Sequence, residues 1–130
     1  MKIPKLSSKA FKIELQLYPC IIYVGFRNLK LFEKYLETEK FTKENIKQVV
    51  DCVKENIESN AGACYVFVDG GSGFIFINNI NDNLVDMITH EVYHITESIA
   101  DYIGLKHSTE SEEAYCYLNG YINKEIFKQL

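Results

Sequence analysis

The sequence lacks any apolar run long enough to cross a membrane. Its apolar stretches, such as residues 65–68 and 74–77, are far shorter than the roughly 20 residues that a bilayer span requires. The first 16 residues contain lysines but no continuous apolar region followed by a small-residue cleavage site, so they do not have the form of a secretory signal. We therefore expect a cytoplasmic protein that makes no contact with a membrane.

The sequence also lacks a CxxC pair and a surplus of basic residues. The four cysteines are widely spaced, which argues against a zinc ribbon or a thioredoxin-type redox pair and favours buried free thiols. The formal net charge is -4, and the lysines are scattered among glutamates. A protein with this charge pattern has no electrostatic footprint for a polyanion. Nucleic acid is therefore not an expected partner.

No internal repeat and no proline-rich or glycine-rich linker divides the chain. A length of 130 residues is the usual size of one domain. The apolar fraction of 47% is sufficient for a core, and 25% charged residues is ordinary for a solvated surface. We expect residues 1–130 to form a single domain.

The pattern of the first half of the chain predicts short strands. Residues 11–17 alternate apolar and polar side chains, and residues 21–26 are rich in β-branched and aromatic types, so two strands joined by a short turn are predicted. Residues 64–68 and 74–77 flank a glycine-rich turn and predict a β-hairpin. That turn lacks the Lys-Ser/Thr pair of a phosphate-binding P-loop.

Four helices are predicted around these strands. Asn28 and Thr42 are suitable N-caps for two helices between the strand pairs. From Asp82 the apolar period changes to 3.6 and continues to Gly104, which is suited to a left-handed helix end. A last helix follows from about Thr109. The predicted fold class is α+β: a small twisted β-sheet with covering helices and a C-terminal helix pair that carries a metal site.

Two histidines and a glutamate on the long helix form the predicted metal site. His90 and His94 are four residues apart, so their rings lie about one turn apart on the same side and can converge on one ion. Neutral imidazole is a preferred ligand of Zn²⁺. Glu91 lies about 100° round the helix, where it can contact a metal-bound water and act as a general base. Glu97, on the same polar edge, can orient a histidine ring.

A catalytic zinc needs a third protein ligand and one open position. The last helix begins with Glu110, Ser111, Glu112 and Glu113, and the short loop before it must fold this helix back beside the first one. A carboxylate is thereby expected to reach the histidines. His107, in the loop, is an alternative as the third ligand or as a donor to the transition state.

The HEVYH segment followed by EAYCY resembles the gluzincin group of zinc metallopeptidases. In the aminopeptidase-type members, the ligand glutamate lies 19 residues after the second histidine and is followed three residues later by a small residue. Glu113 and Cys116 stand at these positions, and the resemblance therefore implies His90, His94 and Glu113 as metal ligands. Glu112, one residue off, is the alternative.

The last fifty or so residues are also similar to small HExxH proteins of phages and mobile elements, which carry a glycine and then Ser-Glu-Glu-Ala-Tyr after the motif. Here Gly104 and residues 111–115 stand in those places. The metzincin variant is excluded, because it requires a glycine and a third histidine where this chain has Glu97 and Ala100.

These resemblances imply a minimal zincin-like metallopeptidase whose substrate is a peptide or protein. Zinc would polarise the scissile carbonyl, and Glu91 would take a proton from a zinc-bound water and pass it to the leaving amine. Zincins lay an extended substrate along the sheet edge above the HExxH helix, and residues 74–78 are the strand predicted for that role. The alternative function is a non-catalytic zinc-binding or interaction protein of phage or mobile-element origin. A phage-encoded protein would act in the cytoplasm of the bacterial host.

Overall fold

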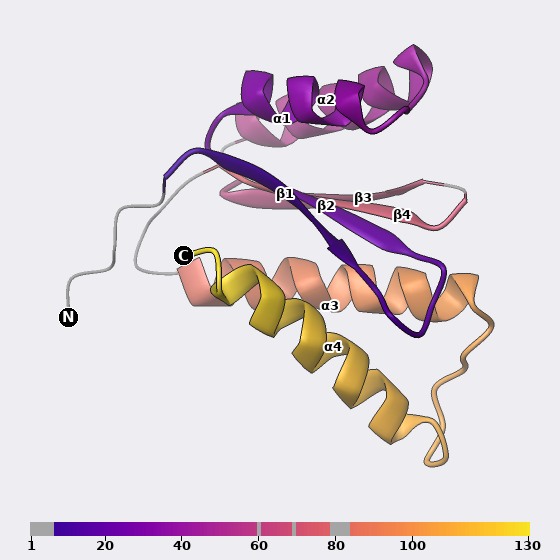
Figure 1. Ribbon diagram of the computed structural model, residues 1–130. Helices are drawn as coiled ribbons and strands as arrows, with labels where there is room; N and C mark the ends of the chain where they lie inside the picture. Colours follow the sequence, from indigo (N-terminus) through magenta and orange to yellow (C-terminus); the bar gives the residue numbers. More distant parts are fainter. Residues whose placement is uncertain (1–6, 60, 69, 79–83) are drawn as a thin grey trace.

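The computed structural model describes residues 7–59, 61–68, 70–78 and 84–130. In this part of the chain, a four-stranded mixed sheet and four helices form an α+β fold (Figure 1). The strands are β1 (Lys9–Glu14), β2 (Ile21–Phe26), β3 (Ala63–Val68) and β4 (Ser72–Ile77). The helices are α1 (Leu29–Thr38), α2 (Lys43–Glu58), α3 (Leu84–Tyr102) and α4 (Glu112–Phe127).

The sheet joins two hairpins side by side in the order β1-β2-β4-β3. The β1–β2 and β3–β4 pairs are antiparallel, as the sequence predicted, whereas β2 and β4 are parallel. Parallel strands require a long crossover connection, and here α1, α2 and β3 lie between β2 and β4 in the chain. As a result, β4 lies inside the sheet and β3 forms one of its edges.

The prediction that residues 74–78 form the sheet edge is therefore wrong. β4 has a strand on both sides, and five of its six residues are buried, whereas β3 has only two buried residues. A strand that is apolar on both faces gains most from a central position, where helices cover both faces. The edge strand beside the HExxH helix is β3.

Helices cover both faces of the sheet (Figure 1). α1 and α2 pack on one face, while α3 and α4 pack on the other. Side chains alternate between the two faces along each strand, so Phe74 and Phe76 belong to the core beneath α1 and α2, whereas Ile75 and Ile77 belong to the core against α3 and α4. No helix among the described residues combines the length and the apolar character that crossing a membrane demands.

The predicted caps of the first two helices are confirmed. The side-chain oxygen of Asn28 accepts a hydrogen bond from the backbone N–H of Leu31 at 3.0 Å, and the hydroxyl of Thr42 accepts one from the N–H of Asn45 at 3.1 Å. Each cap satisfies a backbone donor that has no partner inside the helix.

The C-terminal helix pair differs slightly from its predicted bounds. Gly104 has a φ of 77° and follows the end of α3, as expected for a left-handed C-terminal residue. α4 begins at Glu112, not near Thr109, because Ser108 and Ser111 form a turn in which their side chains bond to each other's backbone N–H groups. The predicted helix start at Asp82 lies outside the described residues.

Gly25 and Gly120 provide a matched test of the packing. A Cβ at position 25 of β2 would lie 2.6 Å from Cγ of the fully buried Phe32 ring in α1, whereas a Cβ at position 120 of α4 would meet nothing within 4 Å. We expect Gly25→Ala to lower the free energy of unfolding by about 1–3 kcal/mol through overpacking. Gly120→Ala should raise it by up to about 1 kcal/mol, because alanine is the better helix former.

Urea denaturation followed by circular dichroism measures both changes against the wild type. A Gly25→Ala variant that is as stable as the wild type would contradict the close approach of β2 and α1.

Candidate active site

His90 and His94 converge on the solvent-facing side of α3. Their Nε2 atoms are 3.1 Å apart, and their ring planes meet at 70°. Two imidazoles bound to one zinc at about 2.0–2.1 Å, with a tetrahedral angle between them, place their nitrogens about 3.3–3.4 Å apart. The separation in the structure is thus close to that of a shared metal ion. Without metal, the same distance suits a hydrogen bond between two neutral rings of complementary tautomers.

Tyr65 holds the second histidine against the sheet. Its ring stacks on the ring of His94 with centroids 4.5 Å apart and planes 9° from parallel. The sequence reasoning did not single out Tyr65 as a site residue. The sequence signal that could have identified Tyr65 is the alternation of side chains along β3. Ala63, Tyr65 and Phe67 all point to the core that contains α3. This stack limits the directions in which the imidazole of His94 can point.

Glu91 lies beside the two histidines at the margin of the core. Glu91 is buried, with only 8% of its surface exposed to solvent. Burial raises the pKa of the Glu91 carboxyl above its ordinary value, and the charges of His90 and His94 offset part of this rise. A carboxyl whose pKa is raised toward neutrality is better suited to take up a proton and release it again. The environment of Glu91 is therefore compatible with its predicted role as a base.

A cleft runs along the edge strand between α2 and α3. It has a volume of about 460 Å³ and is lined by residues of three elements: Cys52 and Asn56 of α2, residues 63–67 of β3, and His90, Glu91 and His94 of α3. A second hollow of about 320 Å³ shares Ala63, His90 and Glu91 with the cleft and is otherwise lined by Gly62, Asp86 and Met87. The three residues of the motif thus line a connected region of the surface.

Within the described part of the chain, β3 has no strand partner on its outer side, so its backbone offers hydrogen-bonding groups along this cleft. The N–H of Asn78 donates to the carbonyl of Gly62 at 2.8 Å, so residues 62 and 78 form a hydrogen-bonded pair of the antiparallel ladder. Because such pairs alternate with non-bonded ones, residues 63, 65 and 67 point their N–H and C=O groups away from β4. These groups lie on the open edge, next to the histidines.

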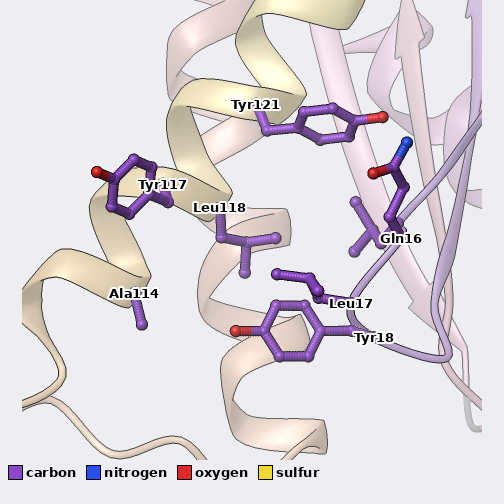
Figure 2. Close-up of a pocket in the computed structure, with 8 residues that line it drawn as sticks. Gln16, Leu17, Tyr18, Ala114, Tyr117, Leu118 and Tyr121 are labelled. Atoms are coloured by element: carbon purple, nitrogen blue, oxygen red, sulfur yellow. The ribbon is translucent and has the colours of Figure 1, made fainter.

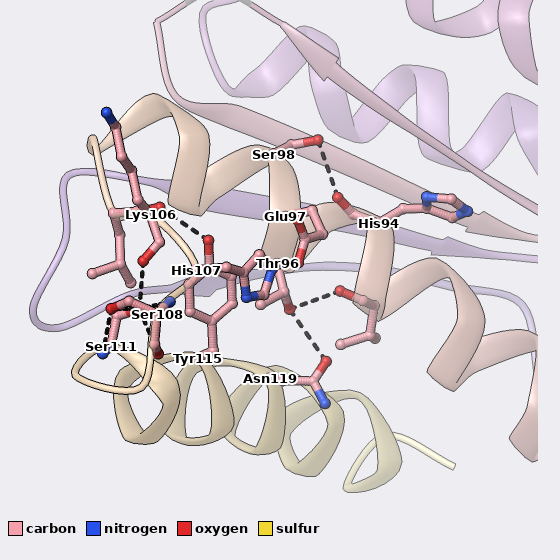
Figure 3. Close-up of polar contacts among 12 residues, drawn as sticks. His94, Thr96, Glu97, Ser98, Lys106, His107, Ser108, Ser111, Tyr115 and Asn119 are labelled. Carbon is pink, nitrogen blue, oxygen red and sulfur yellow. Dashed lines mark hydrogen bonds and ion pairs between the residues drawn. The ribbon is translucent and has the colours of Figure 1, made fainter.

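The carboxylates predicted as the third ligand lie elsewhere. Glu112 and Glu113 are exposed in the first turn of α4. The hydroxyl of Thr96 in α3 donates to the side-chain oxygen of Asn119 at 3.3 Å (Figure 3), and Glu113 lies six residues before Asn119, about 9 Å along the helix. This register puts the start of α4 beside the C-terminal end of α3, beyond His94.

The described residues accordingly include no group of three or more His, Cys, Asp or Glu side chains that could hold a metal ion. The structure brings together His90, His94 and Glu91 from the predicted site, and it does not bring Glu113 or Glu112 to them. Of the three predicted ligands, the structure therefore brings two, His90 and His94, close to each other. The role of Glu113 stays a prediction.

His107 is engaged in a separate cluster (Figure 3). Its Nε2 contacts the carboxylate of Glu97, and its ring stacks on Tyr115 with centroids 3.7 Å apart. The hydroxyl of Tyr115 donates to the carbonyl of Leu105 at 2.9 Å. These contacts fasten the loop between α3 and α4 to both helices. Glu97 therefore pairs with His107 in the structure and not with a ring nitrogen of His94.

An apolar cavity of about 410 Å³ lies between the β1–β2 turn and α4 (Figure 2). Leu17, Tyr18, Tyr117 and Tyr121 are among its lining residues, and none of the lining residues is His, Cys, Asp or Glu. Its lining residues thus include no carboxylate, thiol or imidazole that could bind a metal ion, and the cleft beside β3 is the better candidate for an active site.

Comparisons of the chain with protein-family models, with curated proteins and with solved structures found no match. The interpretation of the cleft accordingly rests on the geometry of its own residues.

Two thiols that differ in burial provide a test of how tightly α2 packs on β3. Cys64 is buried under α2, and burial raises the pKa of its thiol to about 12, whereas Cys116 is exposed on α4. Because the thiolate is the reactive form, iodoacetamide at pH 8 should modify Cys116 rapidly in the native protein and Cys64 only after denaturation. Mass spectrometry of the digested protein measures both rates. Rapid native labelling of Cys64 would contradict the described packing.

Proposed function

We propose that this chain is a zinc-dependent metallopeptidase of the HExxH type, with His90 and His94 as metal ligands and Glu91 as the general base. The observation that carries the proposal is the convergence of these three side chains in one cleft beside the free edge of β3. A pair of histidines on a helix does not by itself favour a peptide substrate. The open strand edge next to the pair does favour one, because it can bind an extended peptide backbone.

The imidazole pair suits zinc in donor type and in separation. Zinc held there would polarise a scissile carbonyl and lower the pKa of an attacking water. Glu113 is the third ligand that we propose, with Glu112 as the alternative. Because α4 docks with its first turn beyond His94, either carboxylate requires that turn to approach the histidines when metal binds. Coupling of metal binding to local folding of this kind is common in small metal sites.

The chain's own groups would then bind and cut the substrate. The outward N–H and C=O groups of Ala63, Tyr65 and Phe67 would pair with an extended peptide, which would lie across His90. Glu91 would accept a proton from the attacking water and transfer it to the leaving amine. Burial raises the pKa of the Glu91 carboxyl, which favours both proton uptake from the water and proton donation to the amine.

A non-catalytic zinc-binding or interaction protein is the second candidate function. One observation favours it: among the described residues, only two of the three protein ligands of a catalytic zinc lie together. Two surface histidines one turn apart can instead hold a metal whose other ligands come from a partner molecule.

Metal analysis of the purified protein tests the site. We expect about one zinc per chain in the wild type, as in a mononuclear site, and loss of most of that zinc in His94→Ala and in Glu113→Ala. His107→Ala is the matched control, because His107 belongs to the cluster with Glu97 and Tyr115 and should leave the zinc content unchanged. Unchanged zinc in both His94→Ala and Glu113→Ala would rule out the proposed ligand set.

Replacement of the base separates the two candidate functions. Glu91→Gln should keep the metal but lower peptide hydrolysis by about 10²–10⁴-fold, the usual contribution of a general base. Glu97→Gln, on the same helix, removes a carboxylate that contacts His107 and should retain hydrolysis. Cleavage of a proteome-derived peptide mixture, read by mass spectrometry, measures the effect. Zinc-loaded wild type that cleaves no peptide would favour the non-catalytic function.

A further inference from the structure

The hollow beside His90 has the features of a subsite for one substrate side chain. It is lined by Gly62 and Ala63 at the start of β3 and by Asp86, Met87, His90 and Glu91 of α3. Asp86 precedes His90 by four residues, so it lies one helical turn away on the same edge of α3. A substrate side chain in this hollow would belong to a residue that flanks the scissile peptide bond, which would face His90.

Asp86 is the one acidic residue outside the HExxH motif among the described residues that line this hollow. In the described part of the chain, the Asp86 carboxylate takes part in no ion pair, and no lysine or arginine lines the hollow or the adjoining cleft. Asp86 is exposed in the first turn of α3. Met87 adds an apolar wall beside this charge.

From these observations we propose that the hollow is the specificity subsite of the peptidase and binds a lysine or arginine side chain of the substrate. The inference rests on the proposed function. Asp86 would bind the cationic group, and Met87 would pack against the methylene stem, since long basic side chains have an apolar stem and a charged end. An acidic side chain would be repelled by Asp86, and a small apolar one would leave it without a partner.

The direction of the strand edge gives the position of this basic residue. Antiparallel pairing is the more stable arrangement for an added strand, and in it the carboxyl-terminal part of the peptide lies at the start of β3. Gly62 and Ala63, which line the hollow, are at that end. The lysine or arginine should therefore follow the scissile bond directly.

Cleavage of a peptide mixture by the zinc-loaded protein tests the inference. Wild type should cut mainly before lysine and arginine. Asp86→Asn should lower kcat/KM for a lysine peptide about fivefold relative to its alanine counterpart, in line with a partly exposed ion pair, whereas Asp86→Glu should keep the preference and Asp86→Lys should shift it toward glutamate. Asp101→Asn, at the other end of α3, is the matched control and should keep the preference. Cleavage without enrichment of basic residues, or an unchanged preference in Asp86→Asn, would overturn the proposal.

A binding measurement distinguishes failure of the subsite from failure of the enzyme. Zinc-loaded Glu91→Gln should bind an acetylated alanine hexapeptide with one lysine more tightly than the same peptide with one glutamate, as measured by calorimetry. If wild type cleaves nothing but this difference remains and depends on Asp86, the peptidase function fails and the basic subsite stands. Equal binding of the two peptides would overturn the subsite even if cleavage is observed.

Discussion

Parallel pairing of β2 with β4 is the constraint on which the candidate site depends. It joins the two hairpins so that β4 is enclosed and β3 is left at the edge. The crossover that this pairing requires supplies α1 and α2 for one face of the sheet, and the other face remains for α3 and α4. The HExxH helix therefore lies beside an edge strand, which is paired with β4 on one side only. If the two hairpins had met through β3, no open backbone would border the histidines.

One side of α3 is buried in the core, and its other side lines the cleft. Ile88, Val92, Ile95 and Ile99 are completely buried in the core against the sheet and α4, so the helix has little freedom to rotate. Its other side then has to present His90 and His94 at the edge of β3. Glu91 lies between the two sides, and this intermediate position explains why a carboxyl of the motif is both buried and adjacent to the imidazoles.

Local signals in the sequence predicted much of the fold, whereas non-local features could not be read from it. Caps such as Asn28 and Thr42, and the spacing of His90 and His94, depend on neighbours three or four residues away, which any reader of the sequence can see. Strand order depends on pairing between distant segments, so the edge was assigned to β4. The position of Glu113 depends on how α4 slides along α3, and contacts such as Thr96–Asn119 fix that register. The stacking of Tyr65 on His94 likewise depends on how β3 faces α3.

The geometry of the cleft also bears on how such a small site could be selective. Backbone pairing of an extended peptide with β3 would be nearly independent of the peptide's sequence, because every residue except proline offers the same N–H and C=O groups. Selectivity would then come from side chains that border the edge, and Asp86 is the one carboxyl outside the motif among the described residues that line the cleft and the hollow. An open edge is at the same time a risk, since it can pair with other chains. α2 and α3 flank β3 on its two faces, and residues of both helices line the cleft beside that edge.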